Sequence, residues 1–248
     1  MRLSERSWRS YIDRLRTIND RAADAMTAWM RLHPDAGSEE LVEYAFAIAT
    51  RYGEAAASLA CEMYDRTAAA QGALVPPAEP AATATYQETA KAVQGTAKVS
   101  ETEVPQTVGR LVKQAGVDTT MQNAIRDGAE WAWIPHGDTC AFCITLASNG
   151  WQRASRAAMK GGHAEHIHAN CDCTYSVRFD RKSTVAGYDP GQYRRMYDQA
   201  EGSTPEQKIN AMRRTFYAEN AEEINAQKRS AYAKRRERES SAAEEIEV

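Results

Sequence analysis

Apolar residues recur every three or four positions along the first part of this 248-residue chain. That period places apolar side chains on one face of an α-helix, so the sequence predicts a long helix over residues 5–32. His33 and Pro34 follow directly, and a helix usually ends at or before the residue preceding a proline. The apolar stripe of this helix consists of Trp8, Ile12, Leu15, Ile18, Ala22, Met26 and Trp29.

A second helix is predicted to begin after a turn at residues 35–38. Ser38 is a preferred N-cap residue, and Glu39 and Glu40 suit the positive end of the helix dipole. Because the connection is short, we expect the two helices to form an antiparallel hairpin. The apolar stripe of the second helix contains Leu41, Tyr44, Ile48, Tyr52, Ala55, Leu59 and Met63.

A proline-rich stretch over residues 72–82 interrupts the helical pattern and predicts an extended linker. Helical periodicity returns around residues 83–94 and 105–126. We therefore expect residues 1–127 to form an elongated helical region that serves for docking.

The pattern changes near residue 128, where tryptophans and glycines become frequent. Trp131 and Trp133 lie in a short segment that is typical of a strand, with both indoles on one face. Core packing is the favoured interpretation of these indoles, over a binding platform. Residues 174–179 alternate in the same way as a second strand. The sequence thus predicts a small α+β lobe over residues 128–185.

Residues 186–248 are predicted to form a C-terminal helix and a tail. Thr204, Pro205 and Gln207 make a good helix start, with a capping threonine and a proline at the first helical position. A basic cluster near the end of this helix is a candidate contact for nucleic-acid phosphates, and a solvated helix end is the alternative. The cluster consists of Lys234, Arg235, Arg236 and Arg238.

Bulk composition narrows the class of protein. The net charge of −3 gives no overall attraction to nucleic acid. The sequence has no apolar run of about 18 residues, so we expect no transmembrane helix and no membrane partner. The N-terminal segment is charged and amphipathic, unlike a secretory signal. The fold class is therefore predicted to be mainly α, with a small α+β lobe.

The strongest chemical signal is the pattern C-x2-C-x24-H-x2-C-x-C, formed by Cys140, Cys143, His168, Cys171 and Cys173. Thiolate and imidazole are the usual ligands of tetrahedral zinc. The spacing therefore predicts a zinc knuckle in the lobe, with a structural Zn2+ ion as its cofactor. A closed site with four protein ligands leaves no open position for water, so no catalytic residue is assigned.

Five candidate ligands compete for four positions, and the spacing does not decide which one is left out. The favoured set is Cys140, Cys143 and His168 with one of the last two cysteines, more readily Cys173. Reduced structural cysteines are one alternative to zinc. A disulfide arrangement is another, but it requires an oxidising compartment.

Three residues near the predicted zinc ligands, His163, Glu165 and His166, leave an enzymatic alternative open. They could serve a zinc-supported nuclease or another hydrolase. The H-x-E order does not fit a nucleoside deaminase, because the C-x-x-C pair precedes it here. A metalloprotease requires H-E-x-x-H on a helix, which the chain does not match in this segment. In a structural site, His163 and His166 would instead orient the metal ligands from a second shell.

The segment from residue 131 to residue 179 resembles the C-terminal domain of the Mu F-like phage minor head proteins, the phage head morphogenesis family. That family carries C-x-x-C, a loop and then H-P-N-C-R-C running into a short strand. The matching stretches here are 140–143 and 168–173, followed by 174–177. Ala169 and Asp172 depart from the family pattern, and neither is an expected metal ligand.

The resemblance implies a structural, non-enzymatic virion protein that acts in head assembly and DNA packaging. By the same resemblance its partners are the portal protein and the major capsid protein, with phage DNA as a further candidate. Its location would be the capsid interior near the portal, and the host cytoplasm during assembly. A host zinc-binding adaptor, with the helical hairpin as its interaction surface, is the remaining interpretation.

Overall fold

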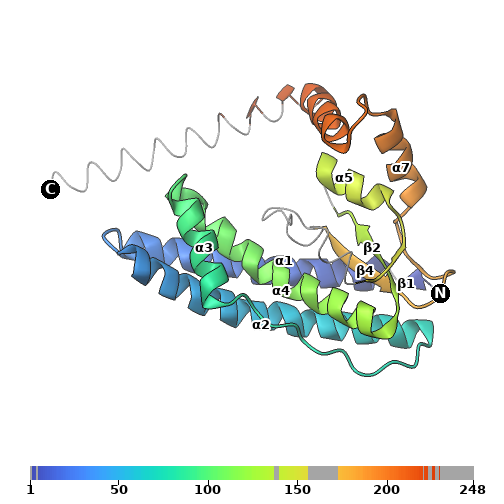
Figure 1. Cartoon of the computed structure of the whole chain (residues 1–248), viewed down its shortest axis with the longest axis horizontal. Helices are drawn as coiled ribbons and strands as arrows, with labels where there is room; N and C mark the ends of the chain where they lie inside the picture. Colours follow the sequence, from blue (N-terminus) through green and yellow to red (C-terminus); the bar gives the residue numbers. More distant parts are fainter. Residues whose placement is uncertain are drawn as a thin grey trace.

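In a computed structural model of the chain, the residues described are 2, 3, 5–136, 140–155 and 173–219, with residues 221, 222, 225, 226 and 229 beyond them. Figure 1 shows a long helical arm along one side and a smaller lobe, built on a sheet, at the end that holds the N-terminus. Within the described residues, no helix is both long enough and apolar enough to cross a membrane.

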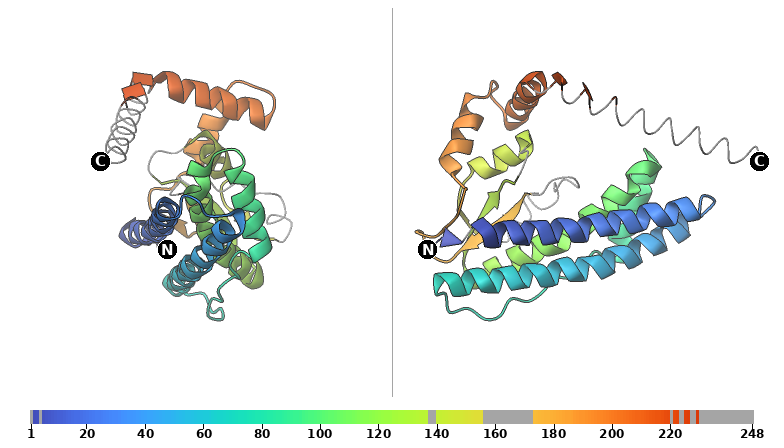
Figure 2. Two further views of the ribbon diagram at one scale, coloured as in Figure 1. Left: turned by 90° about the vertical axis from the view of Figure 1, so that its left-hand side faces the viewer. Right: turned by 180° about the vertical axis from the view of Figure 1, so that it is seen from behind.

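The arm contains the helices α1 (Glu5–Leu32), α2 (Ser38–Gln71), α3 (Tyr86–Ala97) and α4 (Val104–Asp127), with a short 3-10 turn at Glu101–Glu103. The three long helices α1, α2 and α4 each pack against the other two. The expected antiparallel hairpin of α1 and α2 is present, and α4 lies alongside both helices (Figure 2). The predicted helices are therefore confirmed, with boundaries shifted by a few residues.

The apolar stripe of α1 faces the core as its spacing predicted. Trp8, Ile12, Leu15, Ala22 and Met26 are all buried, and the remaining members of the stripe pack against the core from partly exposed positions. A 3.6-residue helix repeat places such positions on one side, so burial follows directly from the sequence pattern.

Two details of α2 differ from the sequence prediction. The N-cap residue is Gly37 rather than Ser38, and the backbone N–H of Gly37 donates to Oε2 of Glu40 at 2.9 Å. Ala55 is exposed, although it belonged to the predicted stripe. Small residues on a neighbouring line of α2 are buried instead, and two of them, Gly53 and Ala56, lie against Ala115 and Gly116 of α4. The small buried residues of that line are Ala45, Ala49, Gly53, Ala56 and Ala60.

Helices α2 and α4 approach closely because one of the facing residues is a glycine. A Cβ atom placed on Gly116 would lie 3.3 Å from the backbone oxygen of Ala56. Such a distance is tighter than ordinary van der Waals contact, so a side chain at position 116 would push the two helices apart. The backbone-to-backbone packing of the arm thus depends on small residues.

The proline-rich linker runs extended along the outside of the arm and is held there by side chains of α4. The Oδ1 of Asn123 accepts from the N–H of Glu79 at 2.9 Å, and its Nδ2 donates to the oxygen of Glu79 at 2.8 Å. Thr119 accepts from the N–H of Ala81. Arg126 donates to the carbonyls of two prolines in the linker. The linker is therefore an ordered strap over residues 73–85.

The lobe contains a three-stranded antiparallel sheet in the order β3-β2-β4. Its strands are β2 (Glu130–Ile134), β3 (Gln152–Arg153) and β4 (Thr174–Arg178). Trp131 pairs with Val177 and Trp133 pairs with Tyr175, so these side chains share one face. Both predicted strands are confirmed, and both indoles are buried as predicted.

The outer edge of β4 is covered by a side chain of the arm. The Nε2 of Gln71 donates to the oxygen of Val177 at 3.3 Å, and its Oε1 accepts from the N–H of Phe179 at 2.8 Å. One amide group thus replaces a neighbouring strand at this edge, which satisfies backbone groups that an open edge would leave unpaired. A separate parallel pair joins β1 (Arg2–Leu3) and β5 (Thr184–Val185).

Two helices of the lobe were not predicted. Helix α5 (Ala141–Ser148) lies in the segment interpreted as a knuckle, and α7 (Pro190–Gln199) packs against it. Asp189 caps α7 by accepting from the N–H of Gly191 at 2.9 Å. Residues 205–219 form a further helix, and the predicted Thr204 cap is present because its Oγ1 accepts from the N–H of Gln207.

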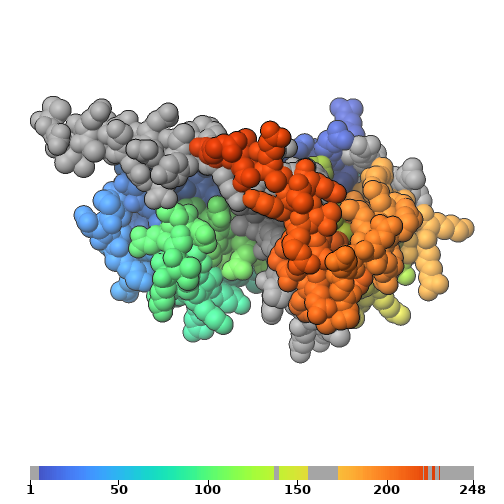
Figure 3. Space-filling model, turned by 90° about the horizontal axis from the view of Figure 1, so that it is seen from above, coloured from blue at the N-terminus to red at the C-terminus, as the bar shows by residue number. Residues whose placement is uncertain are grey.

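Figure 3 shows the helix at residues 205–219 and α7 on one half of the upper face, with α3 on the other half. The buried hydrophobic residues form one cluster that runs from α1 through the sheet to Tyr188. The molecule is therefore mainly helical with a small antiparallel sheet, as expected. The predicted boundaries between the helical region, the lobe and the C-terminal part, at residues 127 and 185, stay predictions.

Candidate functional site

Three of the five predicted zinc ligands lie in the described part of the lobe. Cys140 is the N-cap residue of α5 and is half-buried. Cys143 lies in the first turn of α5 and is 1% exposed. Cys173 directly precedes β4 and is 0% exposed. No disulfide joins Cys61, Cys140, Cys143 and Cys173 to one another.

Two of these cysteines have defined local surroundings. Cys143 occupies the first turn of α5. The backbone N–H of His136 lies 3.4 Å from Sγ of Cys173, within reach for an N–H···S hydrogen bond. Backbone donors of this kind typically surround metal-bound thiolates.

The remaining predicted residues of the site lie outside the described part of the chain. These are the ligands His168 and Cys171, the second-shell candidates His163 and His166, and the hydrolase candidate Glu165. Within the described residues, no group of three or more His, Cys, Asp or Glu side chains could hold a metal ion. The described cysteines therefore do not form a metal-binding group among themselves.

The chemistry of the three cysteines nevertheless fits zinc. Soft sulfur ligands suit Zn2+, and two of the three thiols are shielded from solvent. Cysteines of this segment would supply thiolates to such a site. Within the described residues, however, Cys140, Cys143 and Cys173 are not brought together as metal ligands. The full ligand set, which also includes His168 and Cys171, is not tested.

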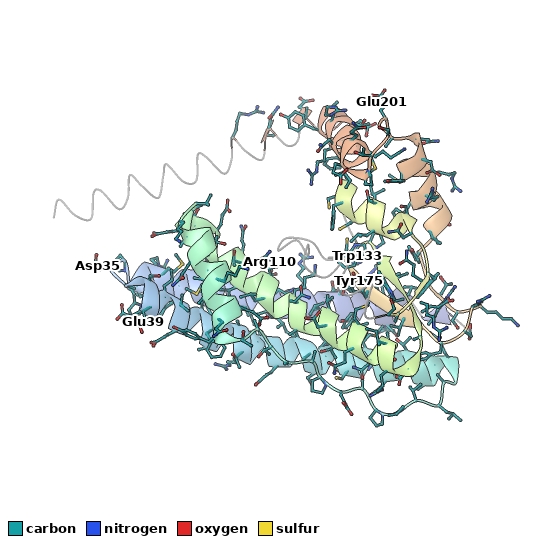
Figure 4. All side chains as sticks on the ribbon, in the orientation of Figure 1. Asp35, Glu39, Arg110, Trp133, Tyr175 and Glu201 are labelled. Atoms are coloured by element: carbon teal, nitrogen blue, oxygen red, sulfur yellow. The ribbon has the colours of Figure 1, made fainter. Side chains whose placement is uncertain are left out.

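An aromatic cluster lies on one face of the sheet. The ring of Tyr175 meets the rings of Trp131 and Trp133 edge to face, with centroids 4.6 Å and 4.8 Å away. Figure 4 places Trp133 and Tyr175 between α4 and α5. Burial raises the pKa of the Tyr175 hydroxyl, so this group stays protonated. The ring cluster lies beside the cysteines, and its packed rings support α5.

A second cluster connects the sheet to α7. Nε of Arg178 donates to Oε2 of Glu130 at 2.6 Å, across the pair of strands β2 and β4. The guanidinium of Arg178 also lies over the ring of Trp151, 4.8 Å from its centroid. The hydroxyl of Tyr188 donates to the oxygen of Ala147 at 2.8 Å, which joins the segment before α7 to α5. These contacts hold the two strands, Trp151, Tyr188 and α5 together, but none of them forms a reactive group.

Sequence reasoning did not find the carboxylate of α4 that faces the lobe. Burial raises the pKa of Asp118, although a hydrogen bond from Gln114 opposes the shift. The charge of Asp118 also contributes to the raised pKa of Tyr175, across the contact between α4 and β4. A lone aspartate in a helical pattern gives no signal of this proximity, because only the packing of α4 on the sheet creates it.

Other sequence candidates are structural or lie outside the described residues. Cys61 is a partly buried residue of α2, and burial raises its thiol pKa, as expected for packing rather than reactivity. The basic cluster of Lys234, Arg235, Arg236 and Arg238 lies beyond the described residues. Its contact with nucleic acid stays a prediction.

Comparison with known proteins gives one match. A family model described as VG15 protein matches residues 2–200. No curated protein and no solved structure matches the chain. The matched range includes the helical arm, all five cysteines and α7, so one family description covers both regions of the molecule.

Proposed function

Because the chain belongs to the VG15 protein family, a family of phage proteins, we propose that it is a minor head protein of the virion. The observation that carries the proposal is the family match, which includes both the arm and the segment with the C-x2-C and H-x2-C-x-C motifs. Those motifs resemble the Mu F-like minor head proteins. The role is structural and non-enzymatic, and the protein acts in head assembly and DNA packaging.

The proposed partners are the portal protein and the major capsid protein, inside the capsid near the portal. The arm supports this role because it projects away from the lobe and carries exposed apolar residues. Leu32 at the end of α1 is 73% exposed, and Val99 after α3 is 86% exposed. A hydrogen bond from Gln94 to Ser38 brings the end of α3 next to the start of α2. Both apolar residues therefore lie at the same end of the arm, where a partner can cover them.

Co-expression with the portal protein of the same phage tests this proposal. We expect the full chain to co-purify with tagged portal rings, and Leu32→Ser with Val99→Ser to weaken the association. Leu74→Ser is the matched control, since Leu74 is fully exposed on the strap, away from that end. Portal rings that contain none of this chain, both when isolated from co-expression and when isolated from virions, would contradict the proposal.

The second part of the proposal is a structural zinc ion in the lobe, held by four of Cys140, Cys143, His168, Cys171 and Cys173. The buried thiols and the His136 N–H close to Cys173 support it. We expect elemental analysis to find one zinc per chain in the wild type. Cys143→Ser is expected to lose the metal together with folded structure in the lobe, because a structural zinc site contributes folding free energy.

Cys61→Ser is the control for the metal measurement, because Cys61 lies in α2 and outside the predicted site. It is expected to keep the zinc. A wild-type protein that purifies without metal, with reduced thiols and an unchanged fold, would remove zinc from the proposal. Metal-dependent cleavage of DNA that disappears in Glu165→Gln would instead identify the zinc-supported hydrolase.

A further inference from the structure

The strap over residues 73–85 has a regular pattern of half-buried and exposed positions. Val75, Ala78 and Ala81 are half-buried, and the first two pack against the hydrophobic core. The positions between them are exposed, namely Leu74, Pro76, Pro77, Glu79 and Pro80. A period of three residues is that of a polyproline II helix, and proline rings lock the backbone φ angle that this helix requires. One edge of the strap therefore faces the arm, and two edges face solvent.

Backbone polar groups of the strap are turned toward the arm. The N–H of Ala78 donates to Oδ1 of Asp65 on α2 at 2.8 Å. From α4, Nη2 and Nη1 of Arg126 donate to the carbonyl oxygens of Pro76 and Pro77, at 2.9 Å and 3.0 Å. Because the arm satisfies these groups, the exposed edges of the strap present side chains, chiefly proline rings and a leucine, to a partner.

One of the two exposed edges is apolar along its length. Leu74, Pro77 and Pro80 follow one another at intervals of three residues, so a polyproline II repeat places them in one line. Leu74 is fully exposed, and both prolines are exposed as well. From Leu74 to Pro80 this line is about 19 Å long, at about 3.1 Å per residue. The strap thus carries an ordered apolar line on the surface of the molecule.

The chemistry of this line indicates which kind of surface fits it. Proline-rich segments with P-x-x-P spacing dock into grooves lined by aromatic side chains, and Pro77 and Pro80 have this spacing. A segment that is already held in an extended shape loses little conformational entropy on binding. The hydrogen bonds from Arg126 and Asn123 hold the strap in this shape before any partner binds.

The border of the strap adds an electrostatic preference. Glu79 is exposed, and the exposed carboxylate of Asp65 lies one residue away along the strap, where it accepts from Ala78. The guanidinium of Arg126 also borders the strap, but it is paired with the carboxylate of Asp127 at 2.8 Å. The border is therefore acidic, and charge complementarity favours a groove with a lysine or arginine at its rim.

We propose that the strap binds an aromatic-lined groove with a basic rim on the major capsid protein. The line of Leu74, Pro77 and Pro80 enters the groove, and Glu79 contacts the basic rim. The proposal rests on the minor head role, which supplies the capsid protein as a partner. It places the capsid contact apart from the portal contact at the far end of the arm. Figure 2 (right panel) shows the strap, in teal, at the outer border of the arm and away from that end.

The test is binding of the full chain to the purified major capsid protein of the same phage, measured by biolayer interferometry. The double variant Pro77→Ala with Pro80→Ala removes both rings but keeps the backbone carbonyl that Arg126 contacts. It is expected to bind about tenfold more weakly, because both anchors of the contact are truncated. The matched control is Pro34→Ala with Pro205→Ala, which removes two exposed prolines outside the strap and should keep the wild-type affinity.

A single substitution repeats the measurement at a side chain that the fold leaves fully exposed. Leu74→Ser removes no packing within the chain, so it keeps the fold, and it is expected to weaken capsid binding about fivefold. Wild-type affinity in both strap variants would overturn the proposal. Equal losses in the strap double variant and in its proline control would overturn it too, because the strap would then have no special role.

Portal co-purification separates this inference from the proposed function. The strap variants are expected to keep portal association, whereas Leu32→Ser with Val99→Ser is expected to weaken it and to keep capsid binding. A wild-type chain that co-purifies with portal rings but does not bind the capsid protein would overturn the inference alone. A chain that binds neither protein would contradict the minor head role itself. Loss of portal association in the strap variants would place the strap in the portal contact and overturn its assignment to the capsid protein.

Discussion

The arm and the lobe of this molecule are packed in opposite ways. In the arm, α2 and α4 meet through alanine, glycine and valine, and Gly116 allows the two backbones to approach closely. In the lobe, β2 and β4 carry Trp131, Trp133 and Tyr175, whose rings meet edge to face. The interface of α2 and α4 is stabilised by close backbone approach, and the sheet of the lobe by a few large side chains.

The difference predicts which substitutions each region tolerates. A packed interface of small residues has no room for added atoms, so enlarging a residue there causes strain. An aromatic cluster concentrates buried area in few residues, so truncating one leaves a large cavity. The arm should therefore be sensitive to larger side chains, and the lobe to smaller ones.

Truncation in the lobe is expected to have the largest effect. Trp133 is 2% exposed and packs on Tyr175, so Trp133→Ala should lower the free energy of unfolding by about 3–5 kcal/mol. Chemical denaturation monitored by circular dichroism measures this. Trp151→Ala is the control, with a smaller loss expected because Trp151 is only half-buried. Equal losses at both positions would show that the stability of the lobe does not depend mainly on the packed rings around Tyr175.

Enlargement in the arm is expected to have the next largest effect. Gly116→Val places side-chain atoms against the backbone of Ala56, and should destabilise the chain by about 1–3 kcal/mol. Gly95 of α3 is exposed, and an added Cβ there meets nothing within 4 Å. Gly95→Ala should therefore stabilise the chain by about 0.5–1 kcal/mol. Thermal unfolding of both variants provides the comparison, and a shift in the same direction would contradict it.

The strap gives a third comparison, because hydrogen bonds from side chains of α4 hold much of it in place. Asn123→Ala removes both hydrogen bonds to Glu79, and should cost about 1–3 kcal/mol by leaving these backbone groups unsatisfied. Limited proteolysis should then cut within residues 73–85 more quickly than in the wild type. Gln122→Ala removes one exposed bond to the same residue. If both variants resist proteolysis equally, Asn123 does not anchor the strap.

The smallest expected effect concerns pH at the junction between arm and lobe. Burial tends to raise the pKa of Asp127, but hydrogen bonds from Arg126 and Tyr64 outweigh it, and the pKa lies below its usual value. An aspartate with a depressed folded-state pKa stabilises the fold above its unfolded pKa, and this contribution disappears as pH falls through the folded pKa.

Unfolding measured between neutral and acid pH tests this contribution. Asp127→Asn should lose about 1 kcal/mol at neutral pH, and should lose less additional stability than the wild type as the solution is acidified. Asp13→Asn on the exposed face of α1 is the control, and is expected to follow the wild type. Parallel pH profiles for wild type and Asp127→Asn would contradict the assignment.

Most of the arm could be predicted from the sequence, because helix periodicity is a local property. The stripe from Trp8 to Met26 predicted both α1 and its buried face. The error at Ala55 has a tertiary cause, since α4 selects the neighbouring line of small residues on α2. Helix α5 was missed because the cysteine spacing suggested a turn, while its short apolar run is ambiguous without its neighbours. Helix α7 was missed although Asp189 and Pro190 form a recognisable helix start.

The candidate site was likewise predicted only in part from the sequence. The cysteine spacing predicted a zinc centre, and the fold places Cys143 in a helix turn and Cys173 beside His136. Zinc binding itself and the choice of four ligands among the five both stay predictions, because His168 and Cys171 lie outside the described residues.

The sequence by itself determined the helices of the arm and the two main strands, because these depend on spacing along a local backbone. Only the tertiary structure decided three further features. These are the glycine contact between α2 and α4, the covering of the β4 edge by Gln71, and the path of the strap along α4. Each joins residues that are distant in the chain, and such pairs become neighbours only when the core has formed.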